Sequence, residues 1–554
     1  MRFLTTMSIL LASAAAAQSL SDRYFDEYYF PHNPTAATSA GIHKYDDQLE
    51  DYSAGGARKR AAILKKFEAD FAKLPAGPDR DLVLFSIRAQ LLELESIRMW
   101  EKNPDLYSSG LSNSAFVIMS RTFAPPEVRL KALTARERLM PKVLAEGRAN
   151  VKRPPRIYLD VAIEQLPGII SFFEHDVPLA FVAVKDEALL ADFHSANAAV
   201  IDALKKQEEY LKKQAASKYA AEDFKLGVAN FTKKLEYEEM VDIPLDRLLE
   251  IGYENLHANQ KTFRETAAAI DPKRPPQEIL DDLKKDHPAP DKLLDAFRET
   301  CTKLAAFVNE RKIITIPSPV PPILEETPPF MRALTFASMD TPGPYETVAK
   351  EAFFNVTLPE KDWKPERVEG FMASFNRGTI LSTAVHEAYP GHYVQFLWMQ
   401  QVDSRVRKLI GANSNAEGWA HYCEQMMLDE GYSNDPKMRL GQLQDALLRN
   451  ARYIVGIEMH TGKRTFEQGI EFFEKEGYQS HEVAEVETKR GTSDPTYLYY
   501  TLGKLQILKL REDYRRKMGA QYSLQEFHDN FMKQGFPPIK IVRHALLGDD
   551  SPTL

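Results

Sequence analysis

Residues 385–395 read Val385-His386-Glu387-Ala388-Tyr389-Pro390-Gly391-His392-Tyr393-Val394-Gln395. This run places two imidazoles and a carboxylate within seven residues on what reads as a helix. Such a set supplies the material of a zinc site whose neighbouring glutamate activates water. In the familiar zinc-protease pattern the second histidine follows the first by four residues. Here Pro390 occupies that position, and the second histidine comes two residues later.

The Pro390-Gly391 pair decides whether the two histidines can meet. On an unbroken helix, His386 and His392 would point about 120° apart around the axis. Proline removes a backbone donor and glycine tolerates unusual dihedral angles, so this turn should not be an unbroken helix. The sequence therefore predicts a kink that swings His392 back toward His386. The alternative is a kinked core helix with buried histidines.

A second segment, about thirty residues downstream, reads Glu417-Gly418-Trp419-Ala420-His421-Tyr422-Cys423-Glu424. Glu417, His421 and Glu424 lie at i, i+4 and i+7, and so share one face of a helix. In a chain with 27% charged residues such a face is usually solvated. Gly418 permits close backbone approach and Trp419 favours burial, so we expect this face to point inward. A buried glutamate then needs a cation or a hydrogen-bond donor.

Together the two segments resemble the bacterial domain of unknown function 885 family, metallopeptidase-like proteins marked by H-E-x-x-P-G-H followed by E-G-W-A. The resemblance extends from residues 33–43, with Asn-Pro-Thr-Ala-Ala-Thr and Gly-Ile-His, to residues 510–511. It implies a mainly helical, zincin-like fold and zinc-dependent hydrolysis of peptides. It also implies that His386, His392 and Glu417 bind Zn²⁺ and that Glu387 is the general base.

Apolar residues recur at helical spacing through most of the chain, for example over 63–74, 82–100, 126–147, 186–213 and 243–268. Two stretches differ: 313–329 is rich in proline and must be extended, and 334–338 and 353–357 predict short strands. We expect a mainly α fold, a large helical body with a small β-sheet beside the metal-site helix. Residues 18–554 are predicted to form a single domain, with an N-terminal lobe over about 18–310 and a catalytic lobe over about 311–545.

Residues 353–357 have two interpretations. Zincin-type peptidases hold substrate along an exposed strand edge, and this strand would supply such an edge, with Asn355 contacting substrate. Alternatively, it is a buried strand that packs its two aromatic residues.

Arg452 and His460 are candidates to bind substrate. At i and i+8 they fall within about 80° of each other on a helix. Relatives resembling this chain keep an aspartate at the position of Gly456, and Glu458 is left open as a substitute. His421 is a further candidate substrate contact or neighbour of the site. So are Asn355 and Gln395, and for both of these a structural role is favoured.

Tyr500 is the candidate that stabilises the oxyanion. In the resembled family a tyrosine recurs three residues before a glycine, which here is Gly503, and a hydroxyl near zinc can donate to a developing negative charge. Packing is the alternative for a tyrosine-rich stretch. The P-G-Q-A of the family appears here as Pro-Thr-Tyr-Leu at 495–498. His481 and Glu485 form another His–Glu pair at i and i+4, which we interpret as a solvated helix face.

Residues 1–17 predict a signal peptide: Arg2, an apolar run over 3–11 and small residues before a cleavage site at Ala17-Gln18. The apolar run is well short of the ~20 residues that a membrane-spanning helix needs. We expect a periplasmic or secreted protein with no membrane insertion. Cys301 and Cys423 could form at most one bridge, and a free thiol is favoured at Cys423. The net charge of −8 without a basic tract argues against nucleic acid as a partner.

The predicted function is an exported zinc-dependent peptidase that acts on short peptides as a carboxypeptidase or dipeptidyl carboxypeptidase. Its catalytic residues are Glu387 and Tyr500. Two alternatives stay open at this point: a catalytically inactive metal- or peptide-binding protein, and a metal-independent hydrolase that uses paired carboxylates, for instance on glycosides. The sequence leaves oligomeric state and peptide specificity open.

Overall fold

The computed structural model describes residues 18–221, 223–327, 332 and 336–554. The predicted signal peptide, residues 1–17, lies outside these residues. Contacts divide the chain into two compact units. The N-terminal unit comprises Met1–Leu226 and Pro342–Lys350, and the C-terminal unit comprises Gly227–Thr341 and Glu351–Leu554.

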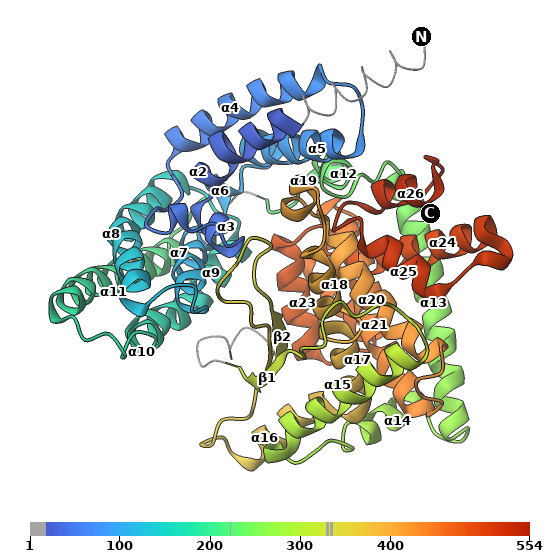
Figure 1. Ribbon diagram of the computed structural model, residues 1–554. Coiled ribbons are helices and arrows are strands. Elements are labelled where there is room, and N and C mark those ends of the chain that lie inside the picture. The colour runs from blue at the N-terminus through green and yellow to red at the C-terminus, as the bar shows by residue number, and fades with distance from the viewer. Residues whose placement is uncertain (1–17, 222, 328–331, 333–335) are drawn as a thin grey trace, which may run out of the picture. The chain divides into compact units, whose positions relative to one another are not determined.

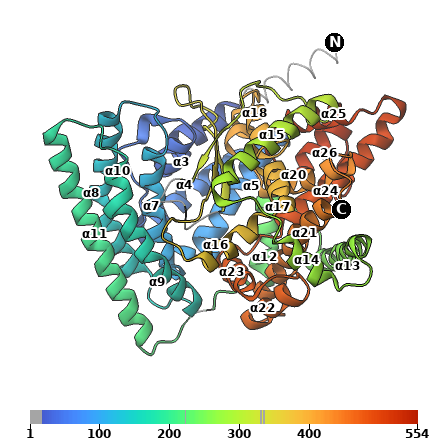
Figure 2. The same ribbon diagram turned by 90° about the horizontal axis from the view of Figure 1, so that it is seen from below.

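The described part of the N-terminal unit is helical. It begins α-helical at residues 18–23, passes into a π-helical stretch at Tyr24–Tyr29 and continues as α2 (Phe30–His32), α3 (Pro34–Ser39), α4 (Ala54–Ala72), α5 (Pro78–Leu92), α6 (Met99–Lys102), α7 (Asp105–Met119), α8 (Pro126–Asn150), α9 (Arg156–Ser171), α10 (Val177–Leu179) and α11 (Glu187–Ala216). The two longest helices of this unit, α8 and α11, lie side by side in both views (Figures 1 and 2). Each buries an apolar stripe at helical spacing, such as Leu130, Leu133 and Leu144 on α8.

Residues 342–350 are held on this unit by close backbone contact. Gly41 has a φ of +84°, and a Cβ there would lie 2.2 Å from the amide nitrogen of Glu346. A Cβ at Gly343 would lie 2.1 Å from the carbonyl oxygen of Ser39. Glycine is therefore required on both sides of this contact.

His43 sits at the same contact, between two carboxylates. Its Nδ1 lies 3.0 Å from Asp46 Oδ2 and its Nε2 lies 3.0 Å from Glu346 Oε2. The imidazole also stacks on Phe123, with ring centroids 3.9 Å apart. The Gly-Ile-His motif at 41–43 thus fixes the 342–350 segment rather than belonging to the metal site.

The C-terminal unit contains the remaining described helices and one small sheet. Its helices are α12 (Gly227–Glu239), α13 (Leu245–Ile270), α14 (Pro276–Leu283), α15 (Leu293–Glu310), α16 (Pro365–Met372), α17 (Arg377–Glu387), α18 (His392–Met399), α19 (Arg405–Leu409), α20 (Asn413–Asp429), α21 (Pro436–His460), α22 (Phe466–Lys475), α23 (His481–Ser493), α24 (Tyr499–Met518), α25 (Leu524–Met532) and α26 (Ile539–Leu547). Helix α17 lies at the centre, where it packs against α15, α20 and α21 (Figure 1).

The sheet has the order β1-β3-β2, with β1 (Ile323–Glu326), β2 (Ala337–Asp340) and β3 (Phe353–Val356). Strand β3 pairs in parallel with β1 and antiparallel with β2. The side chains of Phe354 and Val356 are fully buried and join the core that contains α15 and α17. Strand β2 also contacts α17.

The predicted fold class is confirmed: the chain is mainly α with one small sheet beside the helix that carries His386. Of the two interpretations of 353–357, the exposed edge is wrong, because β3 is the central strand and has a partner on each side, and the buried strand is confirmed. The strand expected at 334–338 is seen at Ala337–Asp340, and residues 334–335 lie outside the described part of the chain. The predicted change of lobe near residue 310 differs from the observed division at Leu226, since α13 and α15 pack on α21 and α17.

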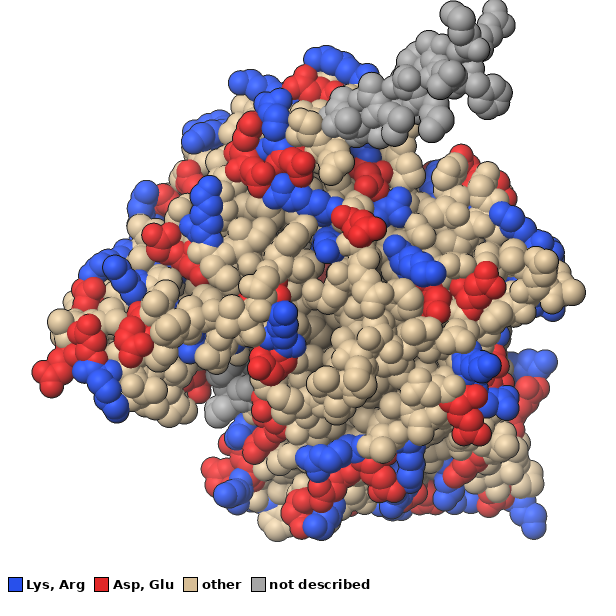
Figure 3. All heavy atoms as spheres, in the orientation of Figure 1, with Lys and Arg blue, Asp and Glu red and all other residues tan. Residues whose placement is uncertain are grey.

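On the face drawn in Figure 3, basic and acidic side chains alternate and neither sign gathers into one large patch. Among the described helices, none combines the length and apolar character needed to cross a membrane. Both cysteines, Cys301 and Cys423, are buried and unbridged.

The His43 contact predicts a pH-dependent contribution to stability. Burial would lower the pKa of His43, but Asp46 and Glu346 outweigh it and raise that pKa above its ordinary value. A raised folded-state pKa stabilises the protein fully below the unfolded value of about 6.5, and the effect is lost as pH rises through the folded value. We expect His43→Gln to reduce the free energy of unfolding in urea more at pH 6 than at pH 9. His194→Gln, at an exposed position of the same unit, is the control. An equal loss at both pH values would contradict the prediction.

Candidate metal centre

The H-E-x-x-P-G-H segment forms a complete break between two helices rather than a kink. Helix α17 ends at Glu387 and α18 begins at His392, with a cis peptide bond between Tyr389 and Pro390. Gly391 packs directly on the end of α17, where a Cβ would lie 1.8 Å from the carbonyl oxygen of His386. Only glycine permits this approach. The break brings the imidazoles of His386 and His392 together, with ring centroids 4.8 Å apart and planes perpendicular.

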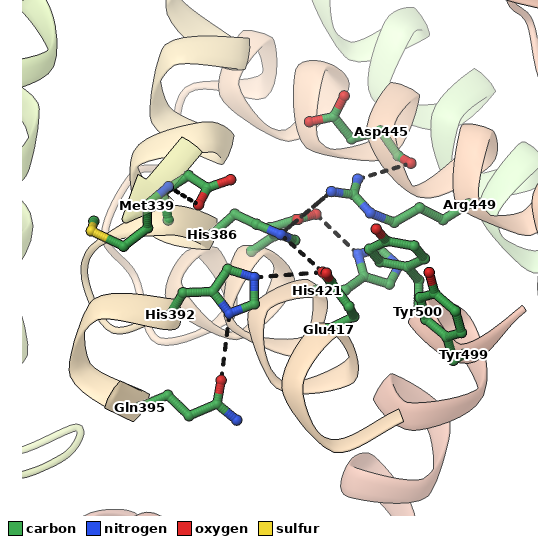
Figure 4. A network of polar contacts seen from close by, with 12 residues as sticks. Met339, His386, His392, Gln395, Glu417, His421, Asp445, Arg449, Tyr499 and Tyr500 are labelled. Atoms are coloured by element: carbon green, nitrogen blue, oxygen red, sulfur yellow. Dashed lines mark hydrogen bonds and ion pairs between the residues drawn. The ribbon is translucent and has the colours of Figure 1, made fainter. Parts of the chain in front are cut away.

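Glu417 on α20 completes a three-residue group with these histidines (Figure 4). Its Oε2 lies 3.4 Å from Nε2 of His386 and 3.5 Å from Nε2 of His392. Tetrahedral zinc with bonds of about 2.0–2.2 Å separates its ligand atoms by about 3.3–3.6 Å. Within the described residues, Glu417 Oε2 is buried without a hydrogen-bond partner. The donor set, its spacing and this orphaned oxygen therefore fit a bound Zn²⁺ ion.

The carboxylate of Glu417 stays ionised although it is buried. Burial would raise the pKa of Glu417, but the two imidazoles hold it well below its ordinary value. Burial would likewise lower the pKa of His386, and the neighbouring carboxylates of Glu417 and Glu424 instead raise it to about 10. The group therefore favours a positive charge beside Glu417. A divalent cation would supply that charge in place of the proton on His386.

A second carboxylate, Glu424, orients His386 from behind. Its Oε1 lies 2.7 Å from His386 Nδ1 and 2.9 Å from Arg449 Nη2. With Nδ1–H donating to Glu424, His386 presents Nε2 to Glu417. A carboxylate behind a ligating histidine fixes its tautomer and raises its basicity. Burial would raise the pKa of Glu424, but the charge of Arg449 and its histidine contacts hold it well below its ordinary range.

His421, a predicted substrate contact, belongs to this support. Its Nδ1 lies 3.0 Å from Glu424 Oε2, and its side chain is buried. Burial, aided by the charge of Lys504, lowers its pKa to about 3, so the imidazole is neutral. His421 is therefore placed to hold Glu424 rather than to touch substrate.

Glu387, the predicted base, faces strand β2. The carbonyl oxygen of Phe336 accepts a backbone hydrogen bond from Thr357, the residue after β3. Backbone amides of an antiparallel strand alternate in direction, so every second residue after Phe336 points its N–H toward β3 and the residues between them point theirs away. Met339 is one of these, and its N–H donates to Glu387 Oε2 at 3.1 Å (Figure 4). The outer edge of β2, not β3, thus holds the carboxylate beside the metal ligands.

A cavity of about 420 Å³ opens onto this site. Its described lining comes from α17, α20, α21, α23, α24, the start of β2 and the 3₁₀ turn Ala373–Phe375. The lining residues that carry charge or a titratable group are His386, Glu387, Glu424, Asp445, Arg449, Arg452, Arg490 and Tyr500. The lining combines the proposed base with three arginines, and its size suits a small ligand.

The other predicted contacts divide between cavity and core. Arg452 and Tyr500 line the cavity. His460 is fully buried, and its Nε2 lies 2.7 Å from the carbonyl oxygen of Gly491. Asn355 is buried in the central strand, and neither it nor His460 is among the described residues of the cavity wall. Gln395 accepts from the His392 ring at 3.5 Å and so lies behind a ligand.

The structure answers two points that concern other acidic and histidine side chains. Glu458, left open as a substitute for the family's aspartate, pairs with Arg464 and Tyr253, so it does not act as a carboxylate of the cavity. His481 pairs with Glu474 on an exposed helix start, which agrees with its interpretation as part of a solvated face, and the candidate metal group among the described residues does not include it.

Arg449 and Arg490 are functional candidates that the sequence reasoning missed. Arg449 lies one helical turn before Arg452 on α21, so the same spacing argument applied one turn earlier would have found it. Arg490 lies on α23, the helix that begins with the His481–Glu485 pair, and no motif in the sequence marks it. For Glu424 the sequence predicted only that it shares an inward helix face with Glu417 and His421, and not that it supports His386.

The chain matches the family described as "Bacterial protein of unknown function (DUF885)" over residues 34–546. The chain belongs to this family. A "putative lipoprotein of unknown function" from Shewanella oneidensis has a similar structure, with 26% identity, a TM-score of 0.80, and coverage of 95% of this chain and 99% of that chain. A "putative lipoprotein" from Colwellia psychrerythraea is 18% identical, also with a TM-score of 0.80, covering 96% and 98%. No curated protein matches the chain. The predicted family is thus confirmed, and its activity stays a prediction.

The close approach at Gly391 predicts that an added methyl group disrupts the ligand set. Gly391→Ala would force the break away from α17 and move His392, because the obstructing atom is backbone. We expect zinc affinity to fall at least ~10-fold, the lower range seen when ligand orientation is disturbed. Gly370→Ala is the matched control, since nothing lies within 4 Å of a Cβ there. Equal zinc affinity of the two variants by competitive chelator titration would contradict the prediction.

Proposed function

We propose that this protein is an exported zinc-dependent peptidase that hydrolyses short peptides near their C-terminus. The observation that carries the proposal is the orphaned Oε2 of Glu417 between the Nε2 atoms of His386 and His392. Beside it stands Glu387, held by the edge of β2 on the cavity wall. Three ligands with an adjacent glutamate are the composition of a zinc hydrolase site.

Each residue of the site has a distinct task in this proposal. A zinc ion bound by His386, His392 and Glu417 would polarise a carbonyl and lower the pKa of a water molecule. Glu387 accepts the proton of the attacking water and passes it to the leaving amine. The Met339 N–H keeps one carboxylate oxygen of Glu387 in place, so the other is available for that proton. The hydroxyl of Tyr500 is the proposed donor to the substrate oxygen that becomes negative.

The proposed substrate and location follow from the cavity and the N-terminus. A space of about 420 Å³ accommodates a few residues of extended peptide and excludes a folded chain. Arginines in its wall favour a ligand that carries a negative charge, such as a C-terminal carboxylate. Export is supported by the signal-like residues 1–17 and by two similar structures whose names call them lipoproteins.

Metal content provides the first test. We expect about one zinc per chain in the purified mature protein by mass spectrometry, and almost none in a variant carrying both His386→Ala and His392→Ala. His481→Ala together with His194→Ala is the matched control, because both of these histidines are exposed. Equal metal in the two double variants would mean that the three-residue group does not bind the metal.

Turnover provides the second test. We expect Glu387→Gln to lower kcat on a short peptide at least ~100-fold while zinc content is unchanged, because a general base contributes about 10²–10⁴-fold. Glu360→Gln, at an exposed position, should leave kcat unchanged. Chelation by EDTA should abolish wild-type turnover. Zinc bound without turnover would indicate a binding protein, and turnover that resists EDTA would indicate a metal-independent hydrolase.

A further inference from the structure

The polar wall of the cavity is a continuous set of contacts that leads away from the metal ligands. Arg449 Nη2 lies 3.4 Å from His386 Nδ1, and its guanidinium lies 5.6 Å from the ring centroid of Tyr500. Arg452 and Arg490 approach the same ring, at 5.0 Å and 5.7 Å. Three guanidiniums therefore surround one tyrosine at the end of this path (Figure 4 shows Arg449 and Tyr500).

Two of the three arginines form buried pairs with carboxylates. Arg452 donates from Nε and Nη2 to both oxygens of Glu487 at 2.7 Å, a bidentate pair with a side-chain exposure of only 10%. Arg449 pairs with Glu424 at 2.9 Å and has an exposure of 12%. Breaking either pair would take a guanidinium away from a buried carboxylate, which is costly. These two arginines serve the structure of the site.

Arg490 differs from both. It uses a single nitrogen, Nη2, for all three of its hydrogen bonds, to Asp494 at 3.1 Å, Tyr499 at 3.2 Å and Tyr500 at 3.3 Å. A guanidinium has five N–H donors. No acceptor among the described residues is in hydrogen-bond geometry with its Nε or Nη1. Its side chain is 35% exposed and lines the cavity.

The orientation of Arg490 is nevertheless fixed. Asp494 and the hydroxyls of Tyr499 and Tyr500 hold Nη2, and the Tyr499 hydroxyl donates in turn to Asp494 at 2.9 Å. The guanidinium is also 6.0 Å from the ring centroid of Tyr497. A cation that is held in place with open donors is prepared for an anionic group, at little cost in ordering. Planar carboxylates match this donor geometry.

We propose that Arg490 binds the free C-terminal carboxylate of the peptide substrate and thereby restricts cleavage to bonds near the C-terminus. The inference rests on the proposed peptidase function and assigns the specificity of that site to Arg490, in place of Arg452 and His460. Arg490 touches the substrate end, while Arg449 and Arg452 position the ligand support and the Tyr500 ring.

The test compares one peptide with and without its negative charge. Acetylated tetra-alanine and its C-terminal amide are offered to the zinc-loaded full-length protein, and products are identified by mass spectrometry. We expect kcat/KM to be about 10- to 100-fold higher for the free acid, the value of one charge-assisted hydrogen bond. In Arg490→Met this ratio should fall to about 1. An effect of the substitution that acts through Tyr500 would lower kcat/KM equally for the acid and the amide, so it would leave their ratio unchanged.

Arg464→Met is the matched control. Arg464 also pairs with a carboxylate, Glu458, and also lies over an aromatic ring, Phe472 at 4.4 Å, but it is not among the residues that line the cavity. It should keep the wild-type ratio. Arg490→Lys retains the charge and loses the planar fork, so an intermediate ratio is expected. If Arg490→Met does not fold, the acid-to-amide ratio of Arg490→Lys is the test of the inference. An unchanged ratio in the folded Arg490 variants would overturn the inference and leave the peptidase proposal intact.

A binding measurement separates the two proposals. The Glu387→Gln protein, loaded with zinc, is titrated calorimetrically with the acid and the amide, with and without Arg490→Met. If the wild type cleaves neither peptide, the peptidase proposal fails. Tighter binding of the acid that depends on Arg490 would then still support the carboxylate site. Equal binding of acid and amide would overturn it.

Discussion

The indole N–H of Trp419 donates to the carbonyl oxygen of Pro390 at 2.9 Å, and this buried bond joins the two segments that supply the ligand set. Pro390 lies in the break between α17 and α18, where a buried carbonyl without a partner would cost about 1–3 kcal/mol. Trp419 is fully buried and stacks on Phe531, which fixes the indole in turn. The position of the break therefore depends on α20, the helix that carries Glu417.

Helix α20 is itself placed by a glycine contact. A Cβ at Gly418 would lie 2.5 Å from the Cα of Gly503 on α24, so the two helix backbones touch at this point. Three successive residues of α20 thus have different roles. Glu417 faces the histidines, Gly418 allows close packing of α24, and Trp419 hydrogen-bonds to the segment between α17 and α18. Because α24 begins with Tyr499 and Tyr500, the same contact sets the distance between the ligand group and the tyrosine end of the cavity.

The sequence could predict the parts of the site that depend on local spacing. The mainly helical fold, the inward face of 417–424 and the meeting of His386 with His392 all follow from residues close in the chain. It could not predict that β2 rather than β3 faces Glu387, since strand order depends on pairing between distant segments. For the same reason the sequence pointed to Arg452 and missed Arg490. Only the fold shows that Glu487 occupies one and that the other keeps open donors.

Gly456 and Tyr497 share one space near Arg490. A Cβ at Gly456 would lie 2.8 Å from the ring of Tyr497, so a larger residue at position 456 and the tyrosine at 497 exclude each other. The fully buried ring of Tyr497 lies 6.0 Å from the guanidinium of Arg490. A carboxylate in place of this ring would compete with a bound anion for the arginines, whereas an aromatic face supports a cation without neutralising it. This pair of residues therefore favours an Arg490 whose open N–H donors are left for a ligand.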